Sequence, residues 1–230
     1  CGMSYEEAVR TYIFEPLGMT QSGFAFKYLE SNRKATGFER YNRKEKLEAI
    51  VYEPPGPYAA GGIYSTVGDL YKFHLGLRAG QILSDTMLNM AQQTNENRYG
   101  YGWLIREVFG KQTLGHSGGG AGFGTDFIWV PADDIFVALL SNEEEDLRPI
   151  FDVMWRILYD RPTRLPKPIS VSDEQMRHYE GKYDAGNGLV IHVYVEDGQL
   201  IAQPEGNRKT ILYVEGENQF YVAELNAAAH

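Results

Sequence analysis

The sequence contains little cysteine, no excess of positive charge and no long apolar run. Its single cysteine, Cys1, rules out a disulfide within the 230-residue chain and indicates no particular redox compartment. The formal net charge of −9 provides no basic stripe that could neutralise phosphates, so we expect no nucleic-acid partner. No apolar run approaches the length of a membrane span, and we expect no transmembrane segment. The 43% hydrophobic and 23% charged residues are typical of a folded globular protein and exclude a disordered or fibrous chain.

Three helix starts are visible in the first ninety residues. Ser4-x-x-Glu7 has the pattern of a capping box, and apolar residues follow it at helical spacing. Thr66-x-x-Asp69 has the same pattern and predicts a second helix, while Ser84 predicts a third that ends near residue 93. The inner face of the second helix is expected to hold Leu70, Phe73 and Leu77.

The middle of the chain changes from helical to strand periodicity. Four short runs, "YGYGWLIREV", "KQTLGHSG", "TDFIWVP" and "DIFVALLSN", are rich in aromatic and β-branched residues and predict antiparallel strands. A helix is then expected over about 147–159, with Pro149 in its first turn and against one face of the sheet. Its inward residues are expected to be Ile150, Phe151, Met154, Ile157 and Leu158.

A Pro-rich linker and a small all-β unit are predicted to complete the chain. The segment "DRPTRLPKPISVS" has three prolines and no periodicity, which predicts a linker over 161–172. A short helix from about Asp173 and four strands, near 188–195, 199–203, 209–214 and 218–223, are expected within 173–230. Four short strands are few for a closed barrel, so this unit could itself be truncated.

The segment "GHSGG", residues 115–119, allows two interpretations. It fits the Gly-x-Ser-x-Gly nucleophile elbow, in which Ser117 would stand between a strand and a helix. The glycines that follow argue against that helix, because each costs roughly 1 kcal/mol relative to alanine. The segment also fits a His-x-Gly strand, which needs glycines and then a second strand, and that order is present. A glycine-rich hairpin with a solvent-facing histidine is the structural alternative.

Several stretches in a fixed order resemble the β-lactamase-related serine hydrolases, which include class C β-lactamases, D-alanyl-D-alanine carboxypeptidases and related esterases. They are "MSYEEAVRTYIFEPLGMTQSGF", "AAGGIYSTVGDLYKF", "YGYGW" and "GHSGGGAGFGTDFIWVPADDIFVALLSN". The resemblance implies an α+β fold, a β-lactamase/transpeptidase-like antiparallel sheet flanked by helices. Residues 1–160 would then be the C-terminal portion of the catalytic domain. The final unit resembles the small lipocalin-like β-domain that some members append.

The resemblance also implies which residues line the site. His116, Ser117 and Gly118 match the family's third motif, and the Gly119 N–H matches one oxyanion donor. The family's nucleophile lies in Ser-x-x-Lys at the start of a buried helix, and a Tyr-x-Asn motif follows it. Neither is recognisable here, and the chain is interpreted as an N-terminally incomplete fragment that is inactive alone. Ser31-x-x-Lys34 fits the letters, but it lies in a polar stretch after "PLGM" and is interpreted as a coincidence.

Two functions of different classes follow from the resemblance. The first is a serine acyl hydrolase that, in its intact form, acts on a D-peptide, a β-lactam or an ester. The second is a non-catalytic binding or cell-envelope protein on the same fold. The resemblance implies export or an envelope location and a small-molecule or peptide substrate. We expect no cofactor and no metal, since His74 and His192 lack metal-ligand spacing, while Tyr99 and Tyr101 could border the site.

Overall fold

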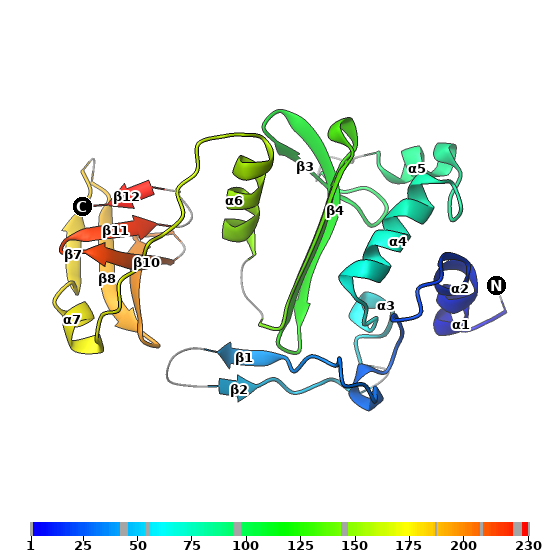
Figure 1. Cartoon of the computed structure of the whole chain (residues 1–230), viewed down its shortest axis with the longest axis horizontal. Helices are drawn as coiled ribbons and strands as arrows, with labels where there is room; N and C mark the ends of the chain where they lie inside the picture. Colours follow the sequence, from blue (N-terminus) through cyan, green and yellow to red (C-terminus); the bar gives the residue numbers. More distant parts are fainter. Residues whose placement is uncertain are drawn as a thin grey trace. The chain divides into compact units, whose positions relative to one another are not determined.

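A computed structural model describes residues 2–41, 46–53, 56–93, 98–143, 147–186, 188–207, 209–222 and 227–229. Its helices and antiparallel sheets confirm the expected α+β class (Figure 1). The chain divides into two compact units, residues 1–40 with 47–145 and residues 41–46 with 146–230. Residues 161–172 hold neither helix nor strand, and the division of the chain at this segment stays a prediction.

The N-terminal helix begins at the capping box that the sequence predicts. The Ser4 hydroxyl accepts the Glu7 N–H at 3.2 Å, and the Glu7 carboxylate accepts the Ser4 N–H at 2.7 Å. Helix α1 (Tyr5–Val9) continues through the π-helical η1 (Arg10–Phe14) into α2 (Glu15–Leu17). Gly18 then ends the helix in the left-handed conformation, with φ of 62°.

Helix α4 (Val67–Arg78) begins as predicted, but its capping box is only half formed. The Thr66 hydroxyl accepts the Asp69 N–H at 3.2 Å, whereas the Asp69 carboxylate accepts Gln21 N–H at 2.7 Å and the Ser22 hydroxyl at 2.9 Å instead. Burial alone would raise the pKa of Asp69, yet its hydrogen bonds, including one from Lys72 at 2.8 Å, outweigh burial and lower it. The acidic residue therefore ties α4 to the loop after α2 instead of closing the cap.

The first unit is built on a four-stranded antiparallel sheet in the order β3-β4-β5-β6. The strands are β3 (Leu104–Val108), β4 (Lys111–Gly120), β5 (Phe123–Val130) and β6 (Ile135–Ser141), which confirms the four predicted strands. Residues 114–117 pair with residues 126–129 of the "TDFIWVP" segment in an antiparallel register. The smaller elements of this unit are η2 (Phe26–Tyr28), α3 (Tyr58–Gly61) and η3 (Pro131–Asp133), while β1 (Phe38–Tyr41) and β2 (Lys46–Glu48) each have one residue in the second unit.

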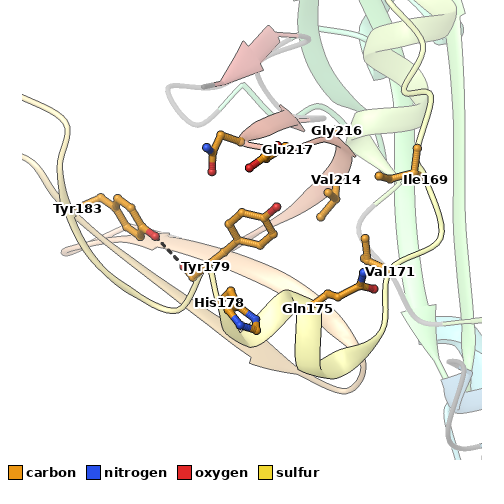
Figure 2. A pocket seen from close by; sticks show the side chains of 10 residues that line it. Ile169, Val171, Gln175, His178, Tyr179, Tyr183, Val214, Gly216 and Glu217 are labelled. Carbon is orange, nitrogen blue, oxygen red and sulfur yellow. Dashed lines mark hydrogen bonds between the residues drawn. The ribbon is translucent and has the colours of Figure 1, made fainter.

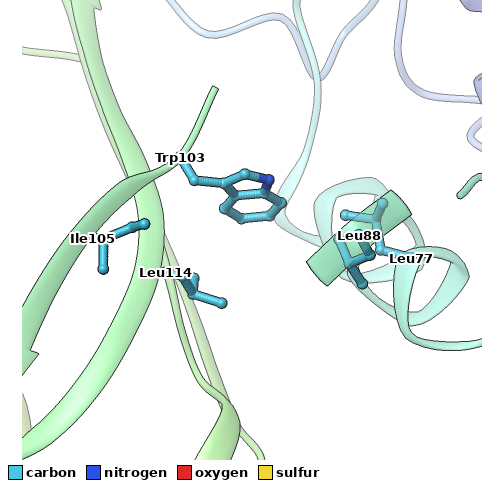
Figure 3. Packing of buried hydrophobic residues seen from close by; sticks show 5 residues of the cluster. All are labelled: Leu77, Leu88, Trp103, Ile105 and Leu114. Carbon is cyan, nitrogen blue, oxygen red and sulfur yellow. The ribbon is translucent and has the colours of Figure 1, made fainter. Parts of the chain in front are cut away.

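The core of the first unit lies between the sheet and the helices α4 and α5 (Asp85–Ala91). Ser84 caps α5, as predicted. Leu77 is buried and Leu70 and Phe73 are partly buried, so the expected inner face of α4 is confirmed. His74 is also buried and stacks on Phe136 at 4.4 Å between ring centroids, which makes it a core residue. The buried cluster comprises Leu77, Leu88, Trp103, Ile105 and Leu114 (Figure 3).

The helix expected over 147–159 is present as α6 (Arg148–Leu158), and its inward face was predicted in part: Phe151 is buried and Met154 is half-buried. Phe151 and Trp155 are its buried residues, one helical turn apart. Ile150, Ile157 and Leu158 are 49%, 57% and 48% exposed, so their predicted inward position was wrong. At 3.6 residues per turn Ile150 lies roughly 100° around the helix from Phe151, outside the narrow aromatic stripe. Leu158 is the last helical residue.

The second unit is a curled half-barrel of six antiparallel strands in simple meander order. After α6 and α7 (Asp173–Arg177) come β7 (Gly181–Asp184), β8 (Val190–Glu196), β9 (Gln199–Pro204), β10 (Thr210–Gly216), β11 (Gln219–Val222) and β12 (Ala227–Ala229). The four predicted strands are confirmed, while β7 and β12 were missed. The core cluster of this unit comprises Met176, Val193, Leu200, Ala202 and Val214.

The Pro-rich segment is fixed to this half-barrel and is not a free connection. Glu215 is the anchor: its carboxylate pairs with Arg164 and accepts the Lys167 N–H at 2.7 Å. The Tyr221 hydroxyl donates to the Arg164 carbonyl at 2.8 Å, and the Ile169 N–H donates to the Val214 carbonyl at 2.9 Å. Residues 164–171, here called the strap, therefore run against β10.

The anchor gives the second unit a defined pH dependence. Hydrogen bonding to the Lys167 N–H and to Arg164 lowers the pKa of Glu215 below 4.5. Its stabilisation is therefore complete above about pH 4.5 and is lost as the pH falls through the lowered folded-state value. Glu215→Gln should lower the unfolding midpoint of the chain in urea at pH 7, and the difference from the parent chain should shrink as the pH is lowered below 4.5.

Glu205→Gln is the matched control, because Glu205 is exposed and its ion pair with His192 lies outside the strap. A Glu215→Gln midpoint equal to that of the parent chain at pH 7 would show that the strap is not anchored by this carboxylate.

Candidate functional site

The distal half of β4 is a free strand edge. β3 pairs with β4 only from Lys111 to Gly115, so within the described ranges the segment 116–120 pairs with β5 alone. Gly118 and Gly119 are exposed on this edge. An unpaired edge made of glycine leaves backbone N–H and C=O groups accessible to a ligand that approaches closely.

The strand continues through Ser117, which excludes the nucleophile elbow. β4 extends to Gly120, and β5 begins at Phe123 after a two-residue turn. An elbow needs a helix directly after the serine, and here a strand hairpin occupies that position. The strand–glycine–strand order expected for His-x-Gly is present.

His116 is oriented by two hydrogen bonds. Its Nδ1 lies 2.7 Å from the Ser117 carbonyl oxygen, and its Nε2 lies 2.9 Å from the Tyr99 hydroxyl. Because a carbonyl can only accept, Nδ1 carries a proton, and in the neutral form of the ring Nε2 accepts the Tyr99 O–H. The ring is half-buried. Tyr99 therefore borders the histidine, as considered from the sequence, whereas Tyr101 is 83% exposed.

The side chains of His116 and Ser117 lie on opposite faces of the sheet. Successive residues of a strand alternate between the two faces, and in the register His116 is opposite Phe127 while Ser117 is opposite Asp126. Ser117 contributes its carbonyl oxygen to the histidine, but its hydroxyl is not on the histidine's face. The edge thus brings together the His116 ring and the backbone of Gly118 and Gly119.

Asp126 is a buried carboxyl group that sequence reasoning missed. It is 7% exposed, and its Oδ1 has no hydrogen-bond partner within the described part of the chain. Burial raises its pKa to about 6, and the opposing effects of Arg106 and His116 do not cancel the shift. Arg106 Nη1 lies 3.9 Å from Oδ2, too far for a strong hydrogen bond. The sequence around Asp126, "TD" at the start of a predicted strand, does not indicate that this carboxyl group is buried.

Other residues considered from the sequence have structural roles. Ser31 accepts the Arg33 N–H at 3.1 Å, Lys34 donates to the Lys27 carbonyl at 2.9 Å, and no helix begins at either. Their interpretation as a coincidental Ser-x-x-Lys stays a prediction. His192 bonds to Glu205 at 3.0 Å. Among the described residues no three His, Cys, Asp or Glu side chains are grouped to hold a metal ion, and no helix there is long and apolar enough to cross a bilayer.

The comparisons identify the class of protein. Residues 2–155 match the beta-lactamase family, and the chain belongs to that family. It is 25% identical to Penicillin-binding protein 4* of Bacillus subtilis (strain 168), over 98% of this chain and 56% of that protein. The octameric penicillin-binding protein homologue from Pyrococcus abyssi superposes with a TM-score of 0.61 and 25% identity, over 96% of this chain and 54% of the homologue.

A D-amino acid amidase from Ochrobactrum anthropi SV3 shares the fold, with a TM-score of 0.57 and 22% identity, over 69% of this chain and 50% of the amidase. The chain spans only a little more than half the length of the first two relatives.

Asp126 should reduce the stability of the folded chain at neutral pH. Its raised folded-state pKa means that its favourable contribution is complete below pH 3.8 and is lost as the pH rises through about 6. Asp126→Asn should therefore raise the free energy of unfolding at pH 7.5 by on the order of 1–2 kcal/mol and change it little at pH 4. Urea unfolding at both pH values measures this.

The exposed Asp85, changed to asparagine, serves as the control for a general charge effect. A destabilised Asp126→Asn chain at pH 7.5 would contradict this account and would show that the ionised carboxylate is needed by the fold.

Proposed function

We propose that the first unit contributes the His-x-Gly side of a serine acyl-hydrolase site. The nucleophilic Ser-x-x-Lys and the Tyr-x-Asn motif would come from residues outside this chain. The observation that carries the proposal is the free glycine edge of β4, which begins at a histidine held by Tyr99. Membership of the beta-lactamase family supports the same assignment.

The proposed chemistry assigns the edge two tasks. When a serine oxygen attacks an acyl carbon, negative charge develops on the carbonyl oxygen, and the Gly119 N–H would stabilise it in place of water. His116, with its tautomer fixed by the Ser117 carbonyl, would assist proton movement between serine and leaving group through its Nε2 side. Tyr99, in hydrogen-bond contact with that nitrogen, would hold the ring in place.

The substrate class follows from relatives and is part of the proposal. An amide or ester of a D-amino acid or D-peptide fits the D-amino acid amidase and the penicillin-binding proteins among the similar proteins. A histidine in place of the motif lysine provides no permanent cation for a substrate carboxylate, which favours esters and amides over β-lactams. An envelope location and a lipocalin-like character of the half-barrel are proposed on the same resemblance.

The chain alone should be catalytically silent. Without a nucleophile and its base, oriented donors have no attack to stabilise. We expect no hydrolysis of a chromogenic β-lactam or a p-nitrophenyl ester above background and no covalent adduct after treatment with a reactive acylating agent, as read by intact mass spectrometry. A stoichiometric acyl group on Ser117 or Ser31 would overturn the assignment of the nucleophile to residues outside this chain.

In the full gene product, His116→Ala should lower kcat/KM by about 10²-fold, equivalent to about 3 kcal/mol of transition-state stabilisation. His116→Lys should retain more activity and shift preference towards carboxylate-bearing substrates. Steady-state kinetics with D-amino acid amides and esters measure both. His192→Ala is the matched control, because His192 has a partly exposed side chain and belongs to the second unit.

Stability of the His116→Ala protein should stay close to that of the parent, because the half-buried ring carries little core packing. A His116→Ala protein that is fully active but folds poorly would show that His116 has only a structural role. A full gene product that binds these substrates without turning them over would favour the non-catalytic binding protein.

A further inference from the structure

The half-barrel carries a pocket that the proposed hydrolase site does not use. Its volume is about 490 Å³, within the range of small-molecule sites. Five segments form it: the strap, α7 with the residues that follow it, β7, the end of β10, and the turn between β10 and β11 (Figure 2). All of these segments belong to the second unit, so the pocket is complete within it.

The pocket walls are held by contacts that do not involve a ligand. The strap is anchored by Glu215, and the Ser172–Gln175 capping box fixes the start of α7. Tyr179 packs edge-on against Phe220 at 5.0 Å between ring centroids. The Tyr183 hydroxyl donates to the Tyr179 carbonyl at 2.9 Å, drawn as the dashed line in Figure 2. A site that is already ordered costs less conformational entropy on binding.

The chemistry of the lining favours a cation with an apolar body. Ile169, Val171 and Val214 provide aliphatic surface, and Tyr179 and Tyr183 provide aromatic rings. No lysine or arginine is among the described residues that line the pocket. The turn contributes Glu217, a carboxylate without an ion-pair partner within the described ranges.

His178 adds a second acceptor to the lining. Its Nδ1 lies 2.8 Å from the Glu174 carbonyl oxygen and so must carry the proton. In the neutral form of the ring, Nε2 is then a lone-pair acceptor. A carboxylate, an imidazole acceptor and tyrosine faces together suit an ammonium group, which has three donors and is attracted by aromatic faces.

We propose that this pocket binds a small organic ammonium ion with an aromatic or branched apolar body. Glu217 pairs with the ammonium group, and the strap and Tyr179 enclose the apolar part. The inference goes beyond the proposed hydrolase function and does not depend on a nucleophile, so the chain can be tested as it is.

The test compares three probes of similar size by NMR titration of the ¹⁵N-labelled chain. 2-Phenylethylamine is the cation, 2-phenylethanol is its uncharged analogue, and 3-phenylpropionate is an anion with the same ring. We expect saturable shifts at Val171, Tyr179 and Asn218, with the amine binding about tenfold more tightly than the alcohol, because a charge-assisted hydrogen bond is added. The anion should bind most weakly.

Two variants separate the contributions. Glu217→Gln should weaken amine binding by about tenfold and leave alcohol binding unchanged, whereas Tyr179→Leu should weaken both. Glu205→Gln, outside the pocket, should change neither. Circular dichroism confirms that each variant is folded. Equal affinities for amine and alcohol, shifts centred outside the pocket, or no saturable binding up to about 10 mM would each overturn the proposal.

Discussion

The contact between β4 and β5 requires a residue without a side chain at position 115. A Cβ atom on Gly115 would stand 2.1 Å from the Phe127 carbonyl oxygen, closer than any real side chain approaches backbone. That close approach fixes the register in which His116 faces Phe127 and Ser117 faces Asp126. A slip of one residue would move His116 to the other face of the sheet and remove it from Tyr99.

The same register explains why the site lies at an edge. β3 pairs with β4 only as far as Gly115. Beyond Gly115, β4 consists largely of glycine and has no partner strand on the β3 side. His116 stands at the boundary between the paired and the free halves, where Tyr99 can reach its Nε2. The second unit depends on a different contact. The strap, held by Glu215, lies against β10 and forms one wall of the pocket.

Sequence reasoning predicted most elements of the fold and failed where distant contacts decide. The helix caps at Ser4 and Ser84 depend on residues close together in the sequence and could therefore be predicted from it. Asp69 fits the same pattern, yet its carboxylate finds Gln21 and Ser22, 47 or more residues away, which no local motif reveals. The strand β7 is exposed along its whole length and β12 consists of three alanines, so neither shows the alternation of apolar and polar residues that marks a strand.

The candidate site was predicted to a similar extent. The position of His116 on a strand before glycines followed from the glycine pattern and from family resemblance. The position of the Ser117 side chain on the face opposite His116 follows from strand alternation. The burial of Asp126 beside Arg106 depends on strand pairing, which the local sequence does not reveal. The three-dimensional partner of the histidine, Tyr99, lies 17 residues before it and could only be suggested.

The central claim is that the free edge of β4 receives the reacting acyl group. A crystal structure of the full gene product carrying a stable acyl adduct tests it most directly. The account predicts the adduct on a serine outside this chain, with its carbonyl oxygen roughly 2.7–3.1 Å from the Gly119 nitrogen and beside the His116–Tyr99 pair. An adduct on Ser117, or a carbonyl oxygen bound away from β4, would contradict it.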